Sequence, residues 1–355
     1  MRANCTPLKL AVDARNVASD RRGLGRYARA LLRRIAHRDD VALTLVLDQT
    51  LARFQKRKLS KVLGSSHFTV ATRVPEKCDV VWHPWNGIFL RGGDVHVCTI
   101  ADAAPFKFPA DDPIHRMHEQ APFVTAASGA DRVLTFSHAS QQDLTALLNV
   151  PAESISVTYL GVDDSLVPGS MPPPELSHQQ YILFIGDPAE PRKNFELLYR
   201  AFRRAWPGDD GPLLAVLSQR DPALERVLHL KSDAEDVEGK KNVRLRGLYS
   251  GAIATAVPSL YEGFGMPVIE SMACGTPVIA ARSSSLPEIA GEAALLEDAH
   301  DDVAWSEALK RVAADSSLRA TLRELGLQNV SRFRWETCAD QSLAVFAAAA
   351  RRSMP

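Results

Sequence analysis

Two glutamates eight positions apart flank a glycine-rich turn in the second half of the chain. Glu262 is followed by Gly263-Phe264-Gly265-Met266, then by Pro267 and an apolar stretch that contains Glu270. Proline favours the first turn of a helix, so Pro267 predicts a helix start behind two glycines. Backbone N–H groups at a helix N-terminus bind phosphate oxygens, and carboxylates accept hydrogen bonds from vicinal hydroxyls. We therefore expect the two glutamates to reach different parts of one phosphorylated ligand, such as a sugar and a ribose.

A second candidate segment lies upstream and is basic. Gly186 follows a predicted strand, and Arg192 and Lys193 come directly before a predicted helix at 195–203. Their positive charges suit a pyrophosphate group. The alternative interpretation is that they only keep the surface soluble.

The elements that must position these residues alternate between short apolar runs and amphipathic stretches, which is typical of a parallel α/β sheet. In the first half the predicted strands are Leu8–Val12, Val41–Leu47, Val80–Trp82, Val95–Ile100, Arg132–Phe136 and Ile155–Thr158, and the predicted helices include Tyr27–Ile35 and Gln141–Leu148. In the second half the predicted strands are Tyr181–Ile185, Leu213–Leu217, Val243–Leu245, Ile253–Val257, Val278–Ala281 and Ala294–Leu296, with a helix at Phe195–Arg203.

A proline-rich segment divides the two halves. Val167–Pro174 holds four prolines and a glycine, which predicts an absence of regular structure. We therefore expect a domain at 1–166, a linker at 167–178 and a second domain at 179–334. Two α/β domains imply a ligand-binding cleft at the carboxyl ends of their strands.

The segment Pro258–Pro277 resembles the E-x7-E region of the retaining glycosyltransferases of family 4, which have the GT-B fold. The spacing of Glu262 and Glu270, the G-F-G sequence between them and the helix-opening Pro267 carry the resemblance. Further landmarks of that family are matched by Gly186–Asn194, Ser285–Gly291, Ser137–Asp143, Leu160–Asp163 and Phe333–Glu336. The resemblance implies two Rossmann-like domains with parallel sheets facing across a cleft, and a C-terminal helix at 335–355 that returns to the first domain.

The resemblance also implies an activity. A nucleotide-diphosphate sugar would be the donor, and a hexose would pass with retention to a glycan or polyprenyl-linked acceptor in surface-polysaccharide synthesis. The expected donor-binding residues are Gly186, Arg192, Lys193, Glu262, Gly263, Phe264, Gly265, Met266, Pro267 and Glu270. Of these, Glu262 would orient the donor sugar, Glu270 the ribose, and Lys193 would contact the diphosphate. GDP-mannose is the first donor we expect, because similar motifs are frequent in bacterial mannosyltransferases.

Gly23-Leu24-Gly25 opens the first predicted helix. With Ala28 it imitates the dinucleotide fingerprint, and Asp48 ends the second predicted strand, so an NAD-dependent oxidoreductase is one alternative. That fingerprint needs its first glycine directly after the strand, whereas Gly23 lies eleven residues beyond Val12. We therefore interpret the turn as an acceptor or phosphate loop facing the cleft, as in the resembling family.

A segment that usually reads T-x-H-D in that family has Ala101 in place of the histidine, followed by Asp102. Alanine has no polar side chain, so a non-catalytic nucleotide-sugar-binding protein is a second alternative. Asp102 is the third predicted catalytic residue, with Glu262 and Lys193. His83 either lines the acceptor side or is structural.

Four arginines recur at helical spacing along the first helix: Arg22, Arg26, Arg29 and Arg33. Such a face either docks on anionic lipid or a polyprenyl pyrophosphate, or is an ordinary solvated helix face.

Only Arg246–Ala252 separates two predicted strands of the second domain. Parallel crossovers normally need about a dozen residues. We therefore predict that this crossover has lost its helix or that a flanking strand is irregular, which would weaken donor binding.

Composition narrows the classes of protein. Lys+Arg and Asp+Glu number 42 each, so no net charge argues for a nucleic-acid partner. Five scattered cysteines without a C-x-x-C pair argue against a disulfide framework or a zinc site. We found no D-x-D in a strand-end setting, so we expect no metal and no cofactor. Without an apolar stretch long enough for a membrane span, we expect a cytoplasmic protein that is at most peripheral to a membrane.

Overall fold

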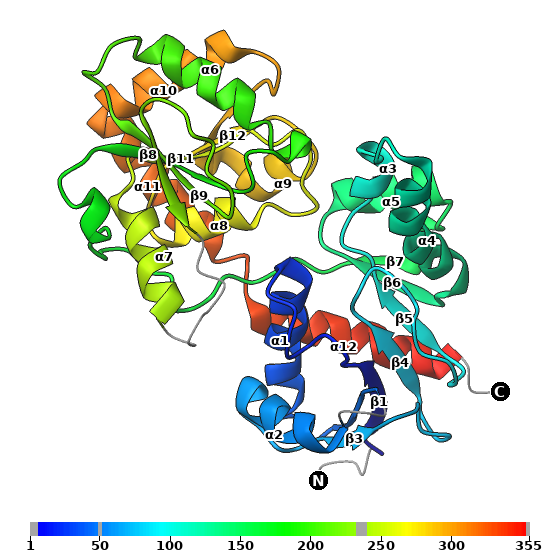
Figure 1. Ribbon diagram of the computed structural model, residues 1–355. Helices are drawn as coiled ribbons and strands as arrows, with labels where there is room; N and C mark the ends of the chain where they lie inside the picture. The colour runs from blue at the N-terminus through cyan, green and yellow to red at the C-terminus, as the bar shows by residue number, and fades with distance from the viewer. Residues whose placement is uncertain (1–5, 49–51, 232–239, 353–355) are drawn as a thin grey trace. The chain divides into compact units, whose positions relative to one another are not determined.

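A computed structural model describes residues 6–48, 52–231 and 240–352 of the chain. The chain divides into two compact units (Figure 1). The N-terminal unit comprises residues 1–161 and 334–355, and the C-terminal unit comprises residues 162–333. Each unit contains one parallel sheet flanked by helices, which confirms the predicted α/β class.

The N-terminal unit is built on a seven-stranded sheet with the order β3-β2-β1-β4-β5-β6-β7. Its strands are β1 (Leu8–Asp13), β2 (Val41–Val46), β3 (Thr69–Ala71), β4 (Val80–His83), β5 (His96–Thr99), β6 (Arg132–Thr135) and β7 (Ile155–Val157). Its helices are α1 (Gly23–Ile35), α2 (Ala52–Leu63), α3 (Ala104–Lys107), α4 (Pro113–Gly129), α5 (His138–Leu148), the 3-10 helix η1 (Ala152–Ser154) and α12 (Trp335–Arg352). All predicted strands of this half are present; β3 was not predicted, because this short edge strand has no fully buried residue to mark it.

Helix α12 contributes to the core of the N-terminal unit although it lies at the end of the chain. The Phe346 ring lies 5.5 Å from the Trp82 ring, and Trp82 packs edge-on against Tyr27 of α1 at 5.8 Å. At the start of the helix, a Cβ on Gly161 would lie 2.2 Å from the backbone nitrogen of Trp335. Only glycine allows the two backbone segments to approach this closely.

The C-terminal unit is built on a six-stranded sheet with the order β10-β9-β8-β11-β12-β13. Its strands are β8 (Tyr181–Ile185), β9 (Leu213–Ser218), β10 (Val227–Lys231), β11 (Ala254–Val257), β12 (Val278–Ala281) and β13 (Ala294–Glu297). Its helices are α6 (Phe195–Ala205), α7 (Lys240–Gly251), α8 (Met266–Ala273), α9 (Leu286–Ala290), α10 (Asp302–Ala314) and α11 (Ser316–Val330), with 3-10 helices η2 (Pro174–Leu176), η3 (Pro191–Lys193) and η4 (Gly291–Ala293). Helix α6 packs with α10, and α8 packs with α11, although each pair is distant in sequence (Figure 1).

Helix α7 corrects the prediction for the crossover before β11. The predicted strand Val243–Leu245 is wrong, because these residues lie inside α7 and the Val243 side chain is 64% exposed. The third strand is β10, so the crossover spans residues 232–253 and keeps its helix, contrary to our prediction of a lost one. Burial of Leu248 and Tyr249 against the sheet outweighs the local alternation of apolar and basic residues. The crossover length therefore no longer argues for weaker donor binding.

The proline-rich segment 167–178 packs on the C-terminal unit. A Cβ on Gly247 of α7 would lie 2.3 Å from the carbonyl oxygen of Met171, so the segment runs directly against that helix. Residues 167–173 have no regular structure, as predicted, and the short 3-10 helix η2 begins at Pro174. The Leu176 side chain is fully buried, and its burial anchors the turn.

Candidate functional site

The predicted site residues of the C-terminal unit gather where the strand order reverses. Strands β8 and β11 are neighbours, and the sequence order of the strands runs in opposite directions on either side of them. Ligands of doubly wound folds bind outside the carboxyl ends of the strands at such a switch point. Lys193 follows β8 at the end of η3, and Glu262 follows β11. The fold therefore brings together two residues that lie far apart in the sequence.

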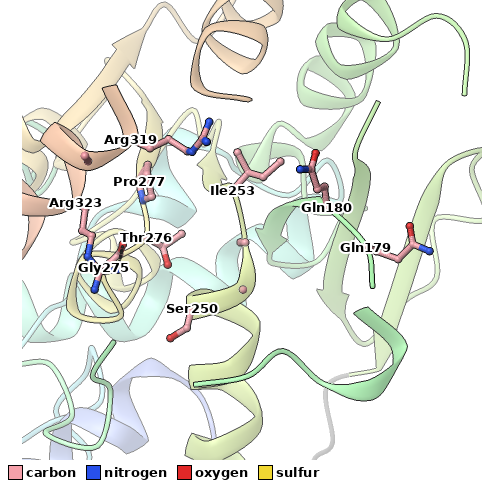
Figure 2. Close-up of a pocket in the computed structure, with 12 residues that line it drawn as sticks. Gln179, Gln180, Ser250, Ile253, Gly275, Thr276, Pro277, Arg319 and Arg323 are labelled. Carbon is pink, nitrogen blue, oxygen red and sulfur yellow. Dashed lines mark hydrogen bonds between the residues drawn. The ribbon is translucent and has the colours of Figure 1, made fainter. Parts of the chain in front are cut away.

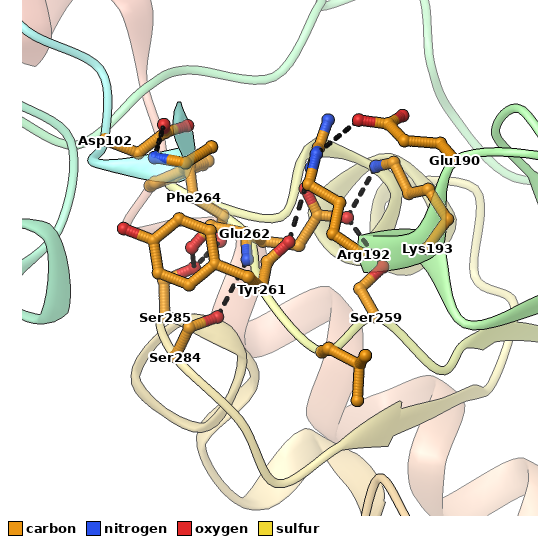
Figure 3. A network of polar contacts seen from close by, with 12 residues as sticks. Asp102, Glu190, Arg192, Lys193, Ser259, Tyr261, Glu262, Phe264, Ser284 and Ser285 are labelled. Atoms are coloured by element: carbon orange, nitrogen blue, oxygen red, sulfur yellow. Dashed lines mark hydrogen bonds and ion pairs between the residues drawn. The ribbon is translucent and has the colours of Figure 1, made fainter. Parts of the chain in front are cut away.

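The carboxylate of Glu262 is the centre of a charged network (Figure 3). Lys193 Nζ lies 2.6 Å from Glu262 Oε1, and Arg192 Nη1 lies 3.2 Å from Glu262 Oε2. The Ser259 hydroxyl donates to Glu262 Oε1 at 2.7 Å. The side chains of Glu262 and Lys193 are only 10% and 13% exposed, so solvent screens their attraction weakly.

Burial and charge act in opposite directions on Glu262. Burial alone would raise the pKa of its carboxyl group, but the positive charges of Lys193 and Arg192 outweigh that effect and hold the pKa below its ordinary value. Glu262 is therefore ionised at neutral pH. A second carboxylate, Glu190, also binds Arg192 through its Nε.

Backbone contacts hold the loops after β8 and β11 together. The backbone N–H of Leu260 donates to the carbonyl of Arg192 at 2.8 Å. The side-chain amide of Asn194 donates to the carbonyl of Pro258 at 3.1 Å. Asn194 has a φ of 53°, a left-handed conformation that asparagine tolerates. The loop that carries Arg192 and Lys193 is thus hydrogen-bonded to the loop that carries Glu262.

The glycine-rich turn begins α8 as the sequence predicts. Gly265 has a φ of 105° and occupies the N-cap position, where as a glycine it has no side chain to cap the helix. Met266 is the first helical residue, and Pro267 lies in the first turn. At the other end Gly275 has a φ of 72°, as expected of a residue that ends a helix. The helix N-terminus with its positive dipole end is therefore formed directly beside the Glu262 network.

Glu270 lies one helical turn into α8 and is almost fully buried. The residue is 3% exposed, and its Oε2 accepts a hydrogen bond from the Tyr249 hydroxyl at 2.9 Å. Tyr249 lies on α7, and its carbonyl accepts from Thr276 Oγ1. Sequence reasoning missed Tyr249 and Ser259, because single polar residues among apolar neighbours carry no motif. Gly186 directly follows β8, and a Cβ on it would lie 3.4 Å from Cδ of Lys193.

The remaining predicted site residues lie in the N-terminal unit. Gly23, Leu24 and Gly25 form the first turn of α1. A Cβ on Gly25 would lie 2.1 Å from the carbonyl oxygen of Asp20, so this glycine is required by a contact within the chain. This packing explains Gly25, the second glycine of the G-x-G-x-x-A pattern, without a bound dinucleotide. Asp48 lies beyond the end of β2.

Two polar residues that the sequence singled out in the N-terminal unit differ in burial. His83 is fully buried, and its Nε2 lies 3.0 Å from Nδ1 of His96. Burial, with smaller contributions from His96 and Arg15, lowers the pKa of His83 to about 3, so its imidazole is neutral at pH 7. Asp102 accepts a hydrogen bond from the backbone N–H of Ala104 at 2.8 Å and is partly exposed.

The arginine face of α1 is largely used within the N-terminal unit. Arg22 forms an ion pair with Asp20 at 2.9 Å. Arg29 donates to the carbonyl of Val17 at 3.0 Å, and Arg33 Nε donates to the carbonyl of Val62 in α2 at 2.8 Å. These contacts support the interpretation of the stripe as an ordinary helix face.

A hollow of about 380 Å³ lies elsewhere in the C-terminal unit (Figure 2). Gln180, Ile253 and Pro277 line it, and each directly precedes a strand, so the hollow lies at the amino-terminal edge of the sheet. The two arginines that border it, Arg319 and Arg323, donate to backbone carbonyls. It is therefore distinct from the site at the carboxyl edge.

The described ranges hold no cluster of possible metal ligands and no helix that could cross a membrane. Among residues 6–48, 52–231 and 240–352, no three His, Cys, Asp or Glu side chains are grouped so that they could hold a metal ion. Within the same described part of the chain, every helix is too short or too polar to cross a membrane.

The chain is similar to known glycosyltransferases. Residues 179–315 match the family described as Glycosyl transferases group 1. The chain is 29% identical over 293 residues to the O-antigen chain mannosyltransferase B of Escherichia coli, which covers 76% of this chain and 74% of that protein. It is also 29% identical over 223 residues to the O-antigen chain mannosyltransferase RfbU of Salmonella typhimurium, which covers 60% of each protein.

The whole chain also resembles solved structures. HepE from Anabaena, in a complex with UDP and glucose, superposes with a TM-score of 0.70 at 16% identity, covering 96% of this chain and 100% of that one. The predicted GT-B fold is thereby confirmed. The chain thus has the GT-B fold, and residues 179–315 of its C-terminal unit match the glycosyl transferases group 1 family.

Proposed function

We propose that the chain is a retaining hexosyltransferase that moves a sugar from a nucleotide-diphosphate sugar to a glycan or polyprenyl-linked acceptor. The observation that carries the proposal is the convergence of Lys193 and Arg192 on Glu262 beside the N-terminus of α8. Sugar transfer leaves a diphosphate whose growing negative charge must be stabilised. Preorganised cations and helix amides supply that stabilisation at little reorganisation cost.

Each residue has a defined part in this proposal. Diphosphate oxygens accept from Lys193, Arg192 and the amides at Gly265-Met266, so the two cations exchange part of their contact with Glu262 for the ligand. The Glu262 carboxylate accepts from hydroxyls of the donor sugar, and Glu270 accepts from the ribose. The departing phosphate oxygen takes the acceptor proton on the same face, and the anomeric configuration is retained.

The donor and the acceptor are proposed from the relatives. Two O-antigen mannosyltransferases are similar over much of the chain, which supports GDP-mannose as the first donor to test. HepE is bound to UDP and glucose, which makes UDP-glucose the second. A surface-polysaccharide acceptor would place the enzyme at the cytoplasmic face of the membrane, as a soluble or peripheral protein. Asp102 in the N-terminal unit is proposed as a catalytic residue on the acceptor side, and Gly23-Leu24-Gly25 as its phosphate loop.

The test combines binding with product analysis. A thermal-shift screen of UDP-, GDP- and ADP-sugars should give one clear stabilising donor, and transfer to polyprenyl-linked saccharide acceptors should give an α-linked product from an α-linked donor. Inverted product would overturn the retaining assignment. Stabilisation by NAD alone would favour an oxidoreductase, and donor binding without transfer or hydrolysis would favour a non-catalytic binding protein. We propose transfer without a metal ion, so turnover with EDTA should equal turnover without it.

A further inference from the structure

A run of three serines, Ser283–Ser285, follows β12. Figure 3 shows Ser284 and Ser285 beside the turn that carries Glu262. We call it the serine loop. The backbone N–H of Glu262 donates to Ser284 Oγ at 2.8 Å. The Ser285 hydroxyl lies 2.8 Å from the carbonyl oxygen of Glu262 and 2.9 Å from that of Phe264, and donates to them. Both backbone polar groups of Glu262 are thus bound by serine side chains.

The serine loop makes a further contact with the turn, and its middle residue has a constrained backbone conformation. Ser283 Oγ donates to the carbonyl of Leu260. Ser284 has a φ of 47°, a left-handed conformation that is rare for serine. Ser285 is fully buried. A residue in such a conformation persists only where its surroundings determine it, and strained residues of this kind cluster at functional sites.

The serine hydroxyls bind backbone carbonyls on one side of the turn that carries Glu262. Loop backbone groups outside regular structure usually find water, which leaves a turn free to move. Here hydroxyls from the neighbouring strand end bind carbonyls of Leu260, Glu262 and Phe264, which are alternate residues of the turn. The turn is therefore held at regular intervals on one side, while the Glu262 carboxylate on its side chain meets Lys193.

We propose that the serine loop is a positioning element that fixes the Glu262 carboxylate for contact with the donor sugar. This inference rests on the proposed function. A catalytic group has to be held within about 0.5 Å of its productive geometry, and supporting hydrogen bonds supply that precision. Ser284 acts on Glu262 alone, whereas Ser285 acts on Glu262 and on Phe264, which leads into the N-terminus of α8.

Two variants and a control test the proposal. Ser284→Gly removes the hydroxyl but suits the left-handed conformation, because glycine adopts it without strain. Ser285→Ala removes both carbonyl contacts. Ser342→Ala is the control: Ser342 is also fully buried and donates to a carbonyl, that of Cys338 at 2.7 Å, but it lies on α12 in the N-terminal unit.

The readout separates positioning from general destabilisation. We measure kcat at saturating donor, per folded protein, together with the Kd of the tightest binder among UDP, GDP and ADP. Ser284→Gly should lower kcat about tenfold and leave this Kd within about twofold. Ser285→Ala should lower kcat about tenfold or more and also weaken nucleoside diphosphate binding. Ser342→Ala should change neither quantity by more than about twofold.

Several outcomes would overturn the proposal. One is a kcat within twofold of wild type for Ser284→Gly; another is an equal loss in the Ser342→Ala control. If Ser285→Ala does not fold, Ser284→Gly alone decides. Glu262→Gln, measured in parallel, separates a failure of the proposed function from a failure of the positioning role. If it retains full turnover, the proposed function fails; if it loses turnover while the serine variants keep theirs, only the positioning role fails.

Discussion

Replacing Glu262 by glutamine tests the central residue of the site. The substitution keeps the size of the side chain but removes its charge. In the wild type this charge lies 2.6 Å from Lys193 Nζ and 3.2 Å from Arg192 Nη1. The same carboxylate is proposed to accept from the donor sugar, so glutamine should affect both stability and turnover.

The two effects can be estimated separately. A hydrogen bond to a charged group contributes about 1.5–3 kcal/mol, and two sugar hydroxyls would therefore contribute about 3–6 kcal/mol. At about 1.4 kcal/mol per tenfold, kcat should fall about 10²-fold to 10⁴-fold. Removing one partner of a buried ion pair costs about 3–5 kcal/mol. Because Arg192 keeps Glu190 as a partner, we expect the lower end of that range for the free energy of unfolding.

The assay measures transfer from the best donor and the free energy of unfolding in urea, each for Glu262→Gln and for Glu190→Gln. Glu190 is the matched control, because its carboxylate also binds Arg192 but is 38% exposed and does not contact Lys193 in the ion pairs of the described residues. Its replacement should cost less than about 1 kcal/mol. Turnover of Glu262→Gln within twofold of wild type, or an equal loss in Glu190→Gln, would refute the assigned role.

The pKa of Glu262 adds a pH signature. Burial alone would raise it, but the neighbouring positive charges outweigh burial, so the folded pKa lies below the ordinary value of 4.5. A depressed carboxyl pKa stabilises the fold above the unfolded pKa, and this stabilisation is lost as the pH falls from about 4.5 through the folded pKa. Wild type should therefore lose more unfolding free energy between pH 5 and pH 3 than Glu262→Gln does. Equal losses would contradict the network.

Three further variants test other parts of the structure. Tyr249→Phe removes the hydroxyl that donates to Glu270, and we expect donor KM to rise about fivefold or more with little change in kcat; an unchanged KM would separate Tyr249 from donor binding. For His83, whose pKa falls to about 3, folded stability should decline as the pH drops from about 6.5 towards 3, and less so in His83→Gln, as urea unfolding at pH 7 and pH 5 would show. Gly25→Ala should lower the free energy of unfolding by about 1–3 kcal/mol because a Cβ would meet a backbone carbonyl at 2.1 Å, whereas Gly23→Ala, with open space around its Cβ, should be near neutral in the same measurement.

Much of the fold could be predicted because buried parallel strands are continuous apolar runs. In the C-terminal unit, the stretches that misled were β10 and α7. Val227–Lys231 contains His229 and a terminal lysine, so it lacks a continuous apolar run, yet it pairs with β9 over its whole length. Val243–Leu245 alternates with basic residues as a strand would, yet it lies in a helix. In both cases long-range pairing and burial decided the structure, and neither is visible in a local window.

The candidate site could likewise be predicted only where its residues have local sequence signals. Glu262, Pro267 and the basic pair at Arg192-Lys193 could be predicted, since glycine, proline and charge at fixed spacing have local physical meanings. The direct ion pair between Lys193 and Glu262 could not, because it depends on β8 and β11 being neighbours in the sheet. Chain order alone leaves that adjacency open.

The contacts of the serine loop could not be predicted from its own segment of the sequence. In the sequence, Ser283–Ser285 matches any polar stretch between a strand and a helix, and only Ser285 falls within a family landmark. Its role depends on the pairing of β12 with β11, which places the ends of the two strands side by side. The serine side chain is short, so its hydroxyl can bind a backbone group only where the two chain segments lie side by side. A rigid Glu262 turn therefore requires the neighbouring strand as much as it requires its own glycines, and substitutions after β12 should affect chemistry that occurs after β11.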